Sequence, residues 1–364
     1  MKKLLVTAAV ILGATVLSAA PKFPTVTAHR GGHIKDYIPE NSIAGVASAK
    51  RFGYDAIECD PKRTSDGVIV VMHDKTINRT MRLKEGYRKI ETPVEVSKTT
   101  FEELRTKYVL ASDDPAQRVQ IPTLEELTLE CKKLGMKMML HSQMMEADRL
   151  VHKILGDEWI CFANKIEVIE TMRAEGFKGL CLFSTEERST DKIAAILEKI
   201  GQPCGISSMD RKKDKTPGER QYTPEFIKAL TSKGYGVQSS IFRTPWEVRS
   251  VSEGCDLVLS DFYWAETDGR KPSENWIFKG RKMAAGVTAE KSFTKLPEYG
   301  AILVSLEFKG RMKVSVAGHN YEFDHPSLSS ELIGIRLYNK VPTLKLEAKG
   351  PCKVKSATAE VYSL

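Results

Sequence analysis

Short apolar runs rich in β-branched residues recur through the first two thirds of the chain, and amphipathic segments separate most of them. Eight runs are expected to be strands: 25–28, 56–60, 137–141, 159–162, 179–182, 204–207, 236–240 and 257–260. Helical periodicity predicts helices at Asn41–Phe52, Thr123–Leu134, Ile166–Glu175, Asp191–Ile200 and Pro224–Lys233. Strands and helices that alternate over about 240 residues indicate an α/β fold of the TIM (β/α)8 barrel type, with its active site at the carboxyl ends of the strands.

One connection breaks this alternation. Asp60 ends one apolar run, and the run 68–73 follows after a short link with the turn signal SDG at 65–67. So short a link cannot carry a parallel crossover. We therefore expect a small hairpin insertion above the barrel, with Asp60 opposite Met72 and His73 beside the carboxylates.

The pattern changes after the barrel domain, which we place at 21–265. Residues 266–284 are polar and irregular, which predicts a linker, and 285–364 alternate with period two. This alternation predicts an antiparallel β-sandwich accessory domain. We find no catalytic group in it, and we interpret His319 and His325 as exposed turn residues rather than a metal pair.

The first twenty residues have the layout of a signal peptide. Two lysines are followed by an apolar run and by small residues at 18–20, which predicts an exported protein, periplasmic or secreted. No later run approaches the roughly 20 apolar residues that span a bilayer, so no integral membrane span is expected.

Net charge and cysteine content restrict the kinds of ligand, metal site and disulfide that the chain is expected to have. The formal net charge is +8, but basic residues are not clustered with aromatics, which favours a small anionic substrate over nucleic acid. The seven cysteines are an odd number without a CxxC pair, so neither a zinc knuckle nor a disulfide pairing is indicated. The sequence does not indicate the oligomeric state.

Two carboxylates form the first candidate site. Glu58 and Asp60 are two apart on a predicted strand, so their side chains share a face. Buried carboxylates require a cation or hydrogen bonds, and oxygen ligands suit Mg²⁺ or Ca²⁺. The alternative is a salt-bridged rim of the barrel.

Two histidines supply the second part. His29 follows the first predicted strand and His73 ends the hairpin, so one imidazole can remove a proton while the other donates one. Arg30 offers a planar fork for phosphate oxygens. A single histidine is more often a packed or surface residue. The two histidines together with Glu58 and Asp60, all at predicted strand ends, favour a catalytic site.

These motifs resemble a known family. HRG at 29–31, PENS at 39–42 and GYDAIECDPKRTSDGVIVVMHDKTINRT look like the glycerophosphodiester phosphodiesterases, which are TIM barrels similar to phosphatidylinositol phospholipase C; IPTLEEL at 121–127 and CDLVLSD at 255–261 extend the resemblance over most of the barrel. It implies acid–base catalysis by His29 and His73, phosphate contact by Arg30, metal binding by Glu58 and Asp60, and a PEN motif at Glu40 and Asn41. Asn41 alternatively caps the following helix.

The chain departs from the family at two strand ends. Where the family usually has Glu-x-Lys, a metal ligand and a phosphate contact, this chain has His141-Ser142-Gln143. As a metal ligand, His141 would shift the preference from Mg²⁺ or Ca²⁺ toward Mn²⁺ or Zn²⁺, and Gln143 could give the substrate only a neutral hydrogen bond. Gln238-Ser239-Ser240 replaces a Trp-Thr pair, which predicts a different acceptor pocket.

The sequence thus predicts an exported, metal-dependent phosphodiesterase that hydrolyses glycerophosphodiesters to glycerol 3-phosphate and an alcohol. Two alternatives stay open: a non-hydrolytic phosphodiester- or glycan-binding protein on a degenerate barrel, and a cyclising phosphodiester lyase. Both histidines and Arg30 are present, which favours an enzyme, because a binding protein needs no proton-transfer pair. The substrate alcohol and the metal stay open.

Overall fold

The computed structural model describes residues 25–32, 37–209, 223–242, 257–260, 271–294, 299–338 and 341–363. The predicted signal peptide, 1–20, lies outside these residues, so its cleavage and the export of the protein stay predictions. No helix in the described ranges is long and apolar enough to cross a membrane.

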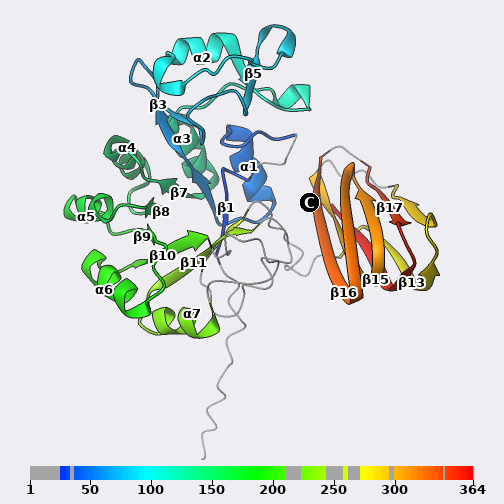
Figure 1. Ribbon diagram of the computed structural model, residues 1–364. Coiled ribbons are helices and arrows are strands. Elements are labelled where there is room, and N and C mark those ends of the chain that lie inside the picture. The colour runs from blue at the N-terminus through cyan, green and yellow to red at the C-terminus, as the bar shows by residue number, and fades with distance from the viewer. Residues whose placement is uncertain are drawn as a thin grey trace, which may run out of the picture.

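Eight parallel strands form a closed barrel, as the sequence predicts (Figure 1). Each runs next to its neighbour in the order β1, β12, β11, β10, β9, β8, β7, β2, and β2 pairs with β1. Their bounds are β1 Thr25–Ala28, β2 Ala56–Cys59, β7 Lys137–His141, β8 Trp159–Ala163, β9 Leu180–Ser184, β10 Cys204–Met209, β11 Gly236–Phe242 and β12 Leu257–Ser260.

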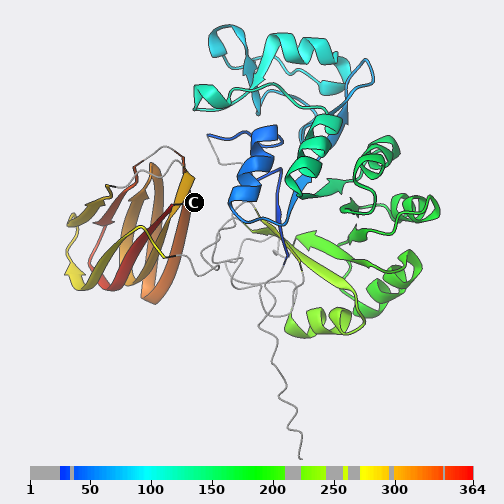
Figure 2. The ribbon, with the colours of Figure 1, turned by 180° about the vertical axis from the view of Figure 1, so that it is seen from behind.

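Helices surround the barrel in both views of the ribbon (Figures 1 and 2). They are α1 Ile43–Arg51, α3 Leu124–Leu134, α4 Met145–Leu155, α5 Ile166–Ala174, α6 Thr190–Ile200 and α7 Pro224–Thr231. The sequence prediction missed α4, whose N-cap residue Met144 makes no side-chain capping hydrogen bond. Polar N-cap residues are the usual start signal of a helix, and α4 has none.

The inside of the barrel holds a polar pair that bears on one prediction. Ser207 donates a hydrogen bond of 2.7 Å from its Oγ to Oε1 of Gln238, and both side chains are fully buried. Gln238 Nε2 lies 3.5 Å from Met139 Sδ. Gln238 therefore belongs to the packed interior of the barrel, and a different acceptor pocket stays a prediction.

The insertion after β2 is larger than the small hairpin we predicted. Between Pro61 and Thr123 the chain has its own apolar cluster, which includes Val70, Ile77 and Leu104. Its elements are β3 Pro61–Arg63, β4 Ile69–Val71, β5 Met81–Leu83, β6 Tyr108–Leu110, α2 Phe101–Lys107 and the 3₁₀ turns Glu85–Tyr87, Val96–Lys98 and Pro115–Gln117.

The first hairpin of this insertion has the predicted register. β3 and β4 pair with Pro61 opposite Val71, and the Met72 N–H donates to the Asp60 carbonyl over 2.9 Å. The hairpin therefore places His73 on the same side as the carboxylates of β2.

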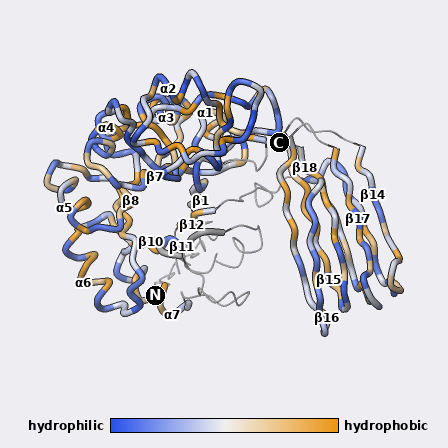
Figure 3. The backbone as a smooth tube through the Cα atoms, turned by 45° about the horizontal axis from the view of Figure 1, so that its top comes forward, coloured by the Kyte–Doolittle hydropathy of each residue, from blue (hydrophilic) through white to orange (hydrophobic). Residues whose placement is uncertain are grey.

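The C-terminal region is a six-stranded antiparallel sheet. Its strands are β13 Glu274–Met283, β14 Thr288–Ser292, β15 Tyr299–Val316, β16 His319–Tyr338, β17 Thr343–Ala348 and β18 Cys352–Ser363. Figure 3 shows hydrophobic and hydrophilic residues alternating along β15 and β16. The antiparallel sheet is thus confirmed, whereas its division into two stacked layers stays a prediction.

Two details of this sheet correct the sequence interpretation, and a third concerns a change of partner along β15. β13 pairs with β18, so part of the predicted linker 266–284 belongs to the sheet. His325 lies inside β16, half-buried against Phe308, and its Nε2 is 2.9 Å from a carboxylate oxygen of Glu331, so it is not an exposed turn residue. At Gly310, where φ is +112°, β15 changes partner from β18 to β17, and a Cβ there would lie 2.3 Å from a backbone oxygen.

Six of the cysteines lie in the described residues, and all six are buried and free: Cys59, Cys131, Cys161, Cys181, Cys204 and Cys352. Burial is the first cause that raises the pKa of the Cys131 thiol, to about 12. These cysteines therefore act as small apolar side chains of the core.

Asp148 on α4 gives a prediction for stability. Its side chain is fully buried, Ser142 donates a hydrogen bond to Oδ1, and burial raises the pKa of the carboxyl to about 6. This folded-state pKa exceeds the unfolded pKa of about 3.9. The protonated Asp148 carboxyl therefore contributes stability that is complete below about pH 3.9 and is lost as the pH rises through about 6. We expect Asp148→Asn to stabilise the fold by about 3 kcal/mol at pH 8 and by about half of that at pH 5.

Urea unfolding of wild type and Asp148→Asn at the two pH values measures this difference. Asp191→Asn, an exposed carboxylate in the first turn of α6, is the control. An equal effect of Asp148→Asn at both pH values would contradict the explanation.

Candidate active site

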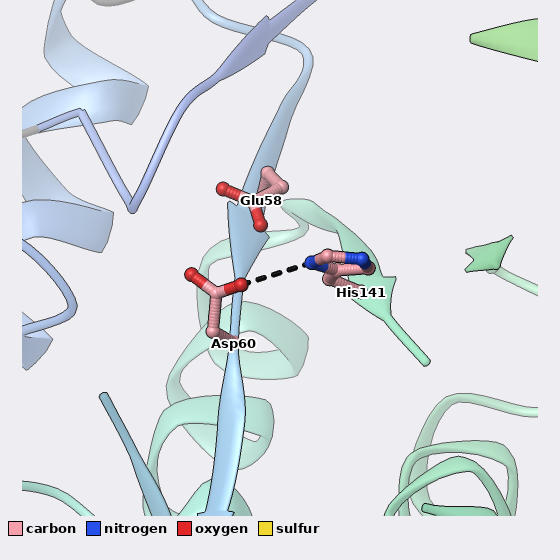
Figure 4. Close-up of side chains that lie close together, drawn as sticks. All are labelled: Glu58, Asp60 and His141. Atoms are coloured by element: carbon pink, nitrogen blue, oxygen red, sulfur yellow. Dashed lines mark hydrogen bonds and ion pairs between the residues drawn. The ribbon is translucent and has the colours of Figure 1, made fainter. Parts of the chain in front are cut away.

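Glu58, Asp60 and His141 meet at the carboxyl ends of two neighbouring strands (Figure 4). Glu58 lies on β2, Asp60 directly follows it, and His141 ends β7. One ligand atom from each residue lies within 4.8 Å of the others, and both carboxylates are buried. The parallel pairing of β2 with β7 creates this group, since side chains at adjacent strand ends point into the same mouth.

The two carboxylates titrate differently. Burial, followed by the charge of Asp60, raises the pKa of Glu58 to about 7. Burial also acts to raise the pKa of Asp60, but a hydrogen bond from His141 and the charge of His73 outweigh it, so this pKa lies below its ordinary value. The hydrogen bond joins His141 Nδ1 to Asp60 Oδ1 over 3.0 Å.

These residues fit a divalent cation. Asp60 Oδ2 is buried and has no hydrogen-bond partner among the described residues. Two carboxylates with an imidazole form a mixed oxygen and nitrogen donor set. A cation would satisfy the unpaired oxygen and offset the repulsion that raises the pKa of Glu58.

His29 and Arg30 form the turn after β1. The backbone N–H of His29 donates to the Ser260 carbonyl over 3.0 Å, and the N–H of Arg30 donates to Glu58 Oε2 over 3.0 Å. Arg30 has φ of +54°, so the chain turns sharply here. His29 is close enough for its charge to lower the pKa of Glu58, so it lies near the group formed by Glu58, Asp60 and His141.

The PEN motif supports this turn. Asn41 donates from its N–H to the Arg30 carbonyl over 2.8 Å, and its side chain is buried with neither polar atom paired within the described ranges. The alternative that Asn41 caps α1 is wrong, because the cap is Ser42, whose Oγ accepts from the Gly45 N–H over 3.1 Å.

A chain of charged contacts runs from Arg30 to His73. Arg30 Nη1 lies 3.2 Å from Glu40 Oε1. Arg79 donates to both oxygens of Glu40, at 2.9 and 2.7 Å, and to Asp74 at 2.6 Å. Asp74 Oδ1 in turn lies 2.7 Å from His73 Nδ1. Arg30 is therefore engaged with Glu40 in this structure.

Sequence reasoning missed Asp74 and Arg79. The hydrogen bond from Arg79 is the first cause that lowers the pKa of Asp74, to about 2. Asp74 therefore stays ionised and holds one nitrogen of His73. Its position directly after His73 was an available signal, whereas the contact between Arg79 and Glu40 spans 39 positions.

Gln143 lies at the same mouth as His141, and its hydrogen bond to the substrate stays a prediction. Its Nε2 is 3.3 Å from His141 Nδ1, and its Oε1 lies 3.4 Å from Lys62 Nζ. Lys62, on β3, was also missed by the sequence reasoning.

Known proteins resemble this chain in sequence. Residues 29–200 match the Glycerophosphoryl diester phosphodiesterase family. A mouse protein, glycerophosphodiester phosphodiesterase 1, is 37% identical over 109 residues, which cover 29% of this chain and 29% of the relative. Glycerophosphodiester phosphodiesterase of Caldanaerobacter subterraneus is 44% identical over 73 residues, covering 20% of this chain and 29% of that protein. The chain thus matches less than a third of the length of these relatives.

Solved structures share the fold. A phosphodiesterase of Oleispira antarctica in complex with the product sn-glycerol-3-phosphate superposes with a TM-score of 0.52 at 19% identity, over 66% of this chain and 94% of the other. A glycerophosphodiester phosphodiesterase of Parabacteroides distasonis gives 0.51 at 18% identity, over 69% and 97%. At these identities the similarity establishes the barrel fold.

Proposed function

We propose that this chain, whose residues 29–200 belong to the glycerophosphoryl diester phosphodiesterase family, hydrolyses glycerophosphodiesters to glycerol 3-phosphate and an alcohol with the help of a metal ion. One observation carries the proposal: His29 and His73 come from separate elements and approach the group of Glu58, Asp60 and His141. Each histidine is close enough for its charge to lower the pKa of one of the carboxylates.

The histidines perform the proton transfers. One imidazole removes the proton of a substrate hydroxyl next to the phosphate, and the other protonates the departing alkoxide. The hydroxyl oxygen forms the new bond to phosphorus as the ester bond to the alcohol breaks, which gives a cyclic phosphate. Water then opens the ring to glycerol 3-phosphate, with the two histidines in reversed roles.

Asp74 orients His73 for proton transfer. Because Asp74 stays ionised, it accepts the proton on His73 Nδ1 and leaves Nε2 to exchange a proton with the substrate. Arg79 fixes Asp74 against Glu40, so the imidazole is held in one orientation.

Glu58, Asp60 and His141 would hold the metal ion, which when bound supplies stabilisation of the charge that develops on the phosphoryl oxygens. The nitrogen donor of His141 favours Mn²⁺ or Zn²⁺ over Ca²⁺. The signal-like segment 1–20 supports export to the periplasm or medium as part of this proposal. Barrel residues alone carry the proposed chemistry, and the C-terminal sheet is an accessory domain.

Arg79 provides a test of the positioning role. We expect Arg79→Met to lower kcat by about tenfold with little change in KM, because His73 loses its fixed orientation while substrate contacts remain. The acid limb of the pH profile should also move to higher pH, since the pKa of Asp74, about 2 in the wild type, rises toward its ordinary value when Arg79 is removed. Steady-state kinetics that extend below pH 4 measure both effects.

Arg149→Met is the matched control, because Arg149 makes a similar two-oxygen contact with Glu175 on the surface. Equal losses in the two variants, or a loss in Arg79→Met without any change in the pH profile, would count against the positioning role.

The proposed reaction is tested by following purified protein with Mn²⁺ and glycerophosphocholine by ³¹P NMR. Conversion of the diester signal to glycerol 3-phosphate is expected. Accumulation of the cyclic phosphate would instead identify the cyclising lyase, and an unchanged diester signal would contradict the proposal for this substrate.

A further inference from the structure

Lys62 occupies a distinctive position at the barrel mouth. It is the second residue of β3, two positions after Asp60, and it is half-buried. Its Nζ lies 3.4 Å from Oε1 of Gln143, which follows β7 two positions after His141. Two segments that each carry a metal-ligand residue thus bring Lys62 and Gln143 together.

Gln143 ties this ammonium to the metal-ligand group. While its Oε1 faces Lys62, its Nε2 lies 3.3 Å from Nδ1 of His141. The amide therefore lies between Lys62 and His141, and the ammonium lies beside the place where the substrate phosphate is expected.

The other cations of the site are already paired. Arg30 contacts Glu40, and Arg79 contacts Glu40 and Asp74. The recorded partners of Lys62 are neutral oxygens, Gln143 Oε1 and the Pro61 carbonyl, both at 3.4 Å. Within the described part of the chain, no carboxylate lies within ion-pair distance of Lys62, and contacts of 3.4 Å are long for N–H···O hydrogen bonds.

An ammonium has three donors and no acceptor, so such weak neutral contacts leave most of its hydrogen-bonding capacity for a ligand. Because Lys62 is half-buried, the surrounding water satisfies its ammonium less fully than it would at the surface, so an anion is a favourable partner. We propose that Lys62 binds a non-bridging oxygen of the substrate phosphodiester. This inference rests on the proposed function, because it names Lys62 as the cation that binds the phosphate group of the proposed substrate.

Binding of sn-glycerol 3-phosphate to the Mn²⁺-loaded protein, measured by isothermal titration calorimetry, tests the inference without turnover. We expect Lys62→Met to weaken binding by about tenfold or more, the usual effect of losing a charge-assisted hydrogen bond. Lys62→Arg should retain most of the affinity. A Lys62→Met/Gln143→Lys double variant should recover it, because the new ammonium starts from the position next to His141.

Arg63→Met is the matched control. Arg63 is the next residue of β3, it carries the same charge, and it is exposed and paired with Glu146 at 3.2 Å. Its loss is expected to change affinity by less than about twofold, as for other surface ion pairs. Equal weakening by Arg63→Met and Lys62→Met would show a general charge effect and overturn the inference, as would wild-type affinity in Lys62→Met.

The two proposals fail in different ways. If the wild type and Lys62→Met both hydrolyse glycerophosphocholine with the same KM, the role of Lys62 is wrong and the proposed function stands. If the wild type hydrolyses no glycerophosphodiester but binds glycerol 3-phosphate in a Lys62-dependent manner, the proposed function is wrong and Lys62 is still the phosphate contact.

Discussion

His73→Ala is expected to lower kcat for glycerophosphocholine by about 10³-fold, because general acid–base catalysis by one positioned side chain contributes about 10² to 10⁴. Affinity for glycerol 3-phosphate should change by less than about threefold, since the imidazole serves proton transfer more than binding. His29→Ala should show a loss of the same order. Single-turnover kinetics with calorimetric binding separate the two effects.

His152→Ala is the control for this prediction. His152 lies in the last turn of α4, where it contacts the Gly156 carbonyl at 2.7 Å and its ring packs against Phe177, which precedes β9. Its loss should leave kcat unchanged. Wild-type turnover in His73→Ala would remove His73 from the mechanism, whereas tight diester binding without turnover in the wild type would favour the binding-protein alternative.

Asp60→Asn is expected to weaken Mn²⁺ binding by at least about a hundredfold and to abolish metal-dependent activity. The substitution removes a charged ligand oxygen and leaves the hairpin backbone, including the Met72 contact, in place. Calorimetric titration with Mn²⁺ measures the loss, and Asp191→Asn again serves as the exposed control. Unchanged Mn²⁺ affinity in Asp60→Asn would contradict the assigned metal site.

The same site predicts a pH dependence. The pKa of Glu58 is raised to about 7 by burial and by Asp60, so protons compete with the metal below that pH. Mn²⁺ affinity should fall by up to about tenfold per pH unit below 7 and level off above it. An affinity that is constant from pH 6 to 8 would show that Glu58 is not a ligand.

The barrel was predictable because its strands are buried on both faces. Such strands are continuous apolar runs, which are recognisable without knowledge of their neighbours. The insertion was not predictable, because β5 pairs with β6 over a long separation, Met81 opposite Leu110, and no local pattern marks that pairing.

Spacing predicted only part of the candidate metal group. Glu58 and Asp60 share one strand face, whereas His141 entered the prediction through the family resemblance, and the pairing of β2 with β7 places it beside them. The contacts of Arg79 and Lys62 depend on where the hairpin folds over the mouth, so sequence spacing could not reveal them. Gln238 shows the opposite case, because its polar side chain turns into the packed interior of the barrel.

The most direct test of the proposed activity is release of glycerol 3-phosphate from glycerophosphocholine by purified protein that is stripped of metal and resupplied separately with Mg²⁺, Ca²⁺, Mn²⁺ and Zn²⁺. We predict no release without metal and the fastest release with Mn²⁺ or Zn²⁺, because His141 supplies a nitrogen ligand. Release that is equally fast in the metal-free protein, or no release with any of the four ions, would contradict a metal-assisted glycerophosphodiester phosphodiesterase.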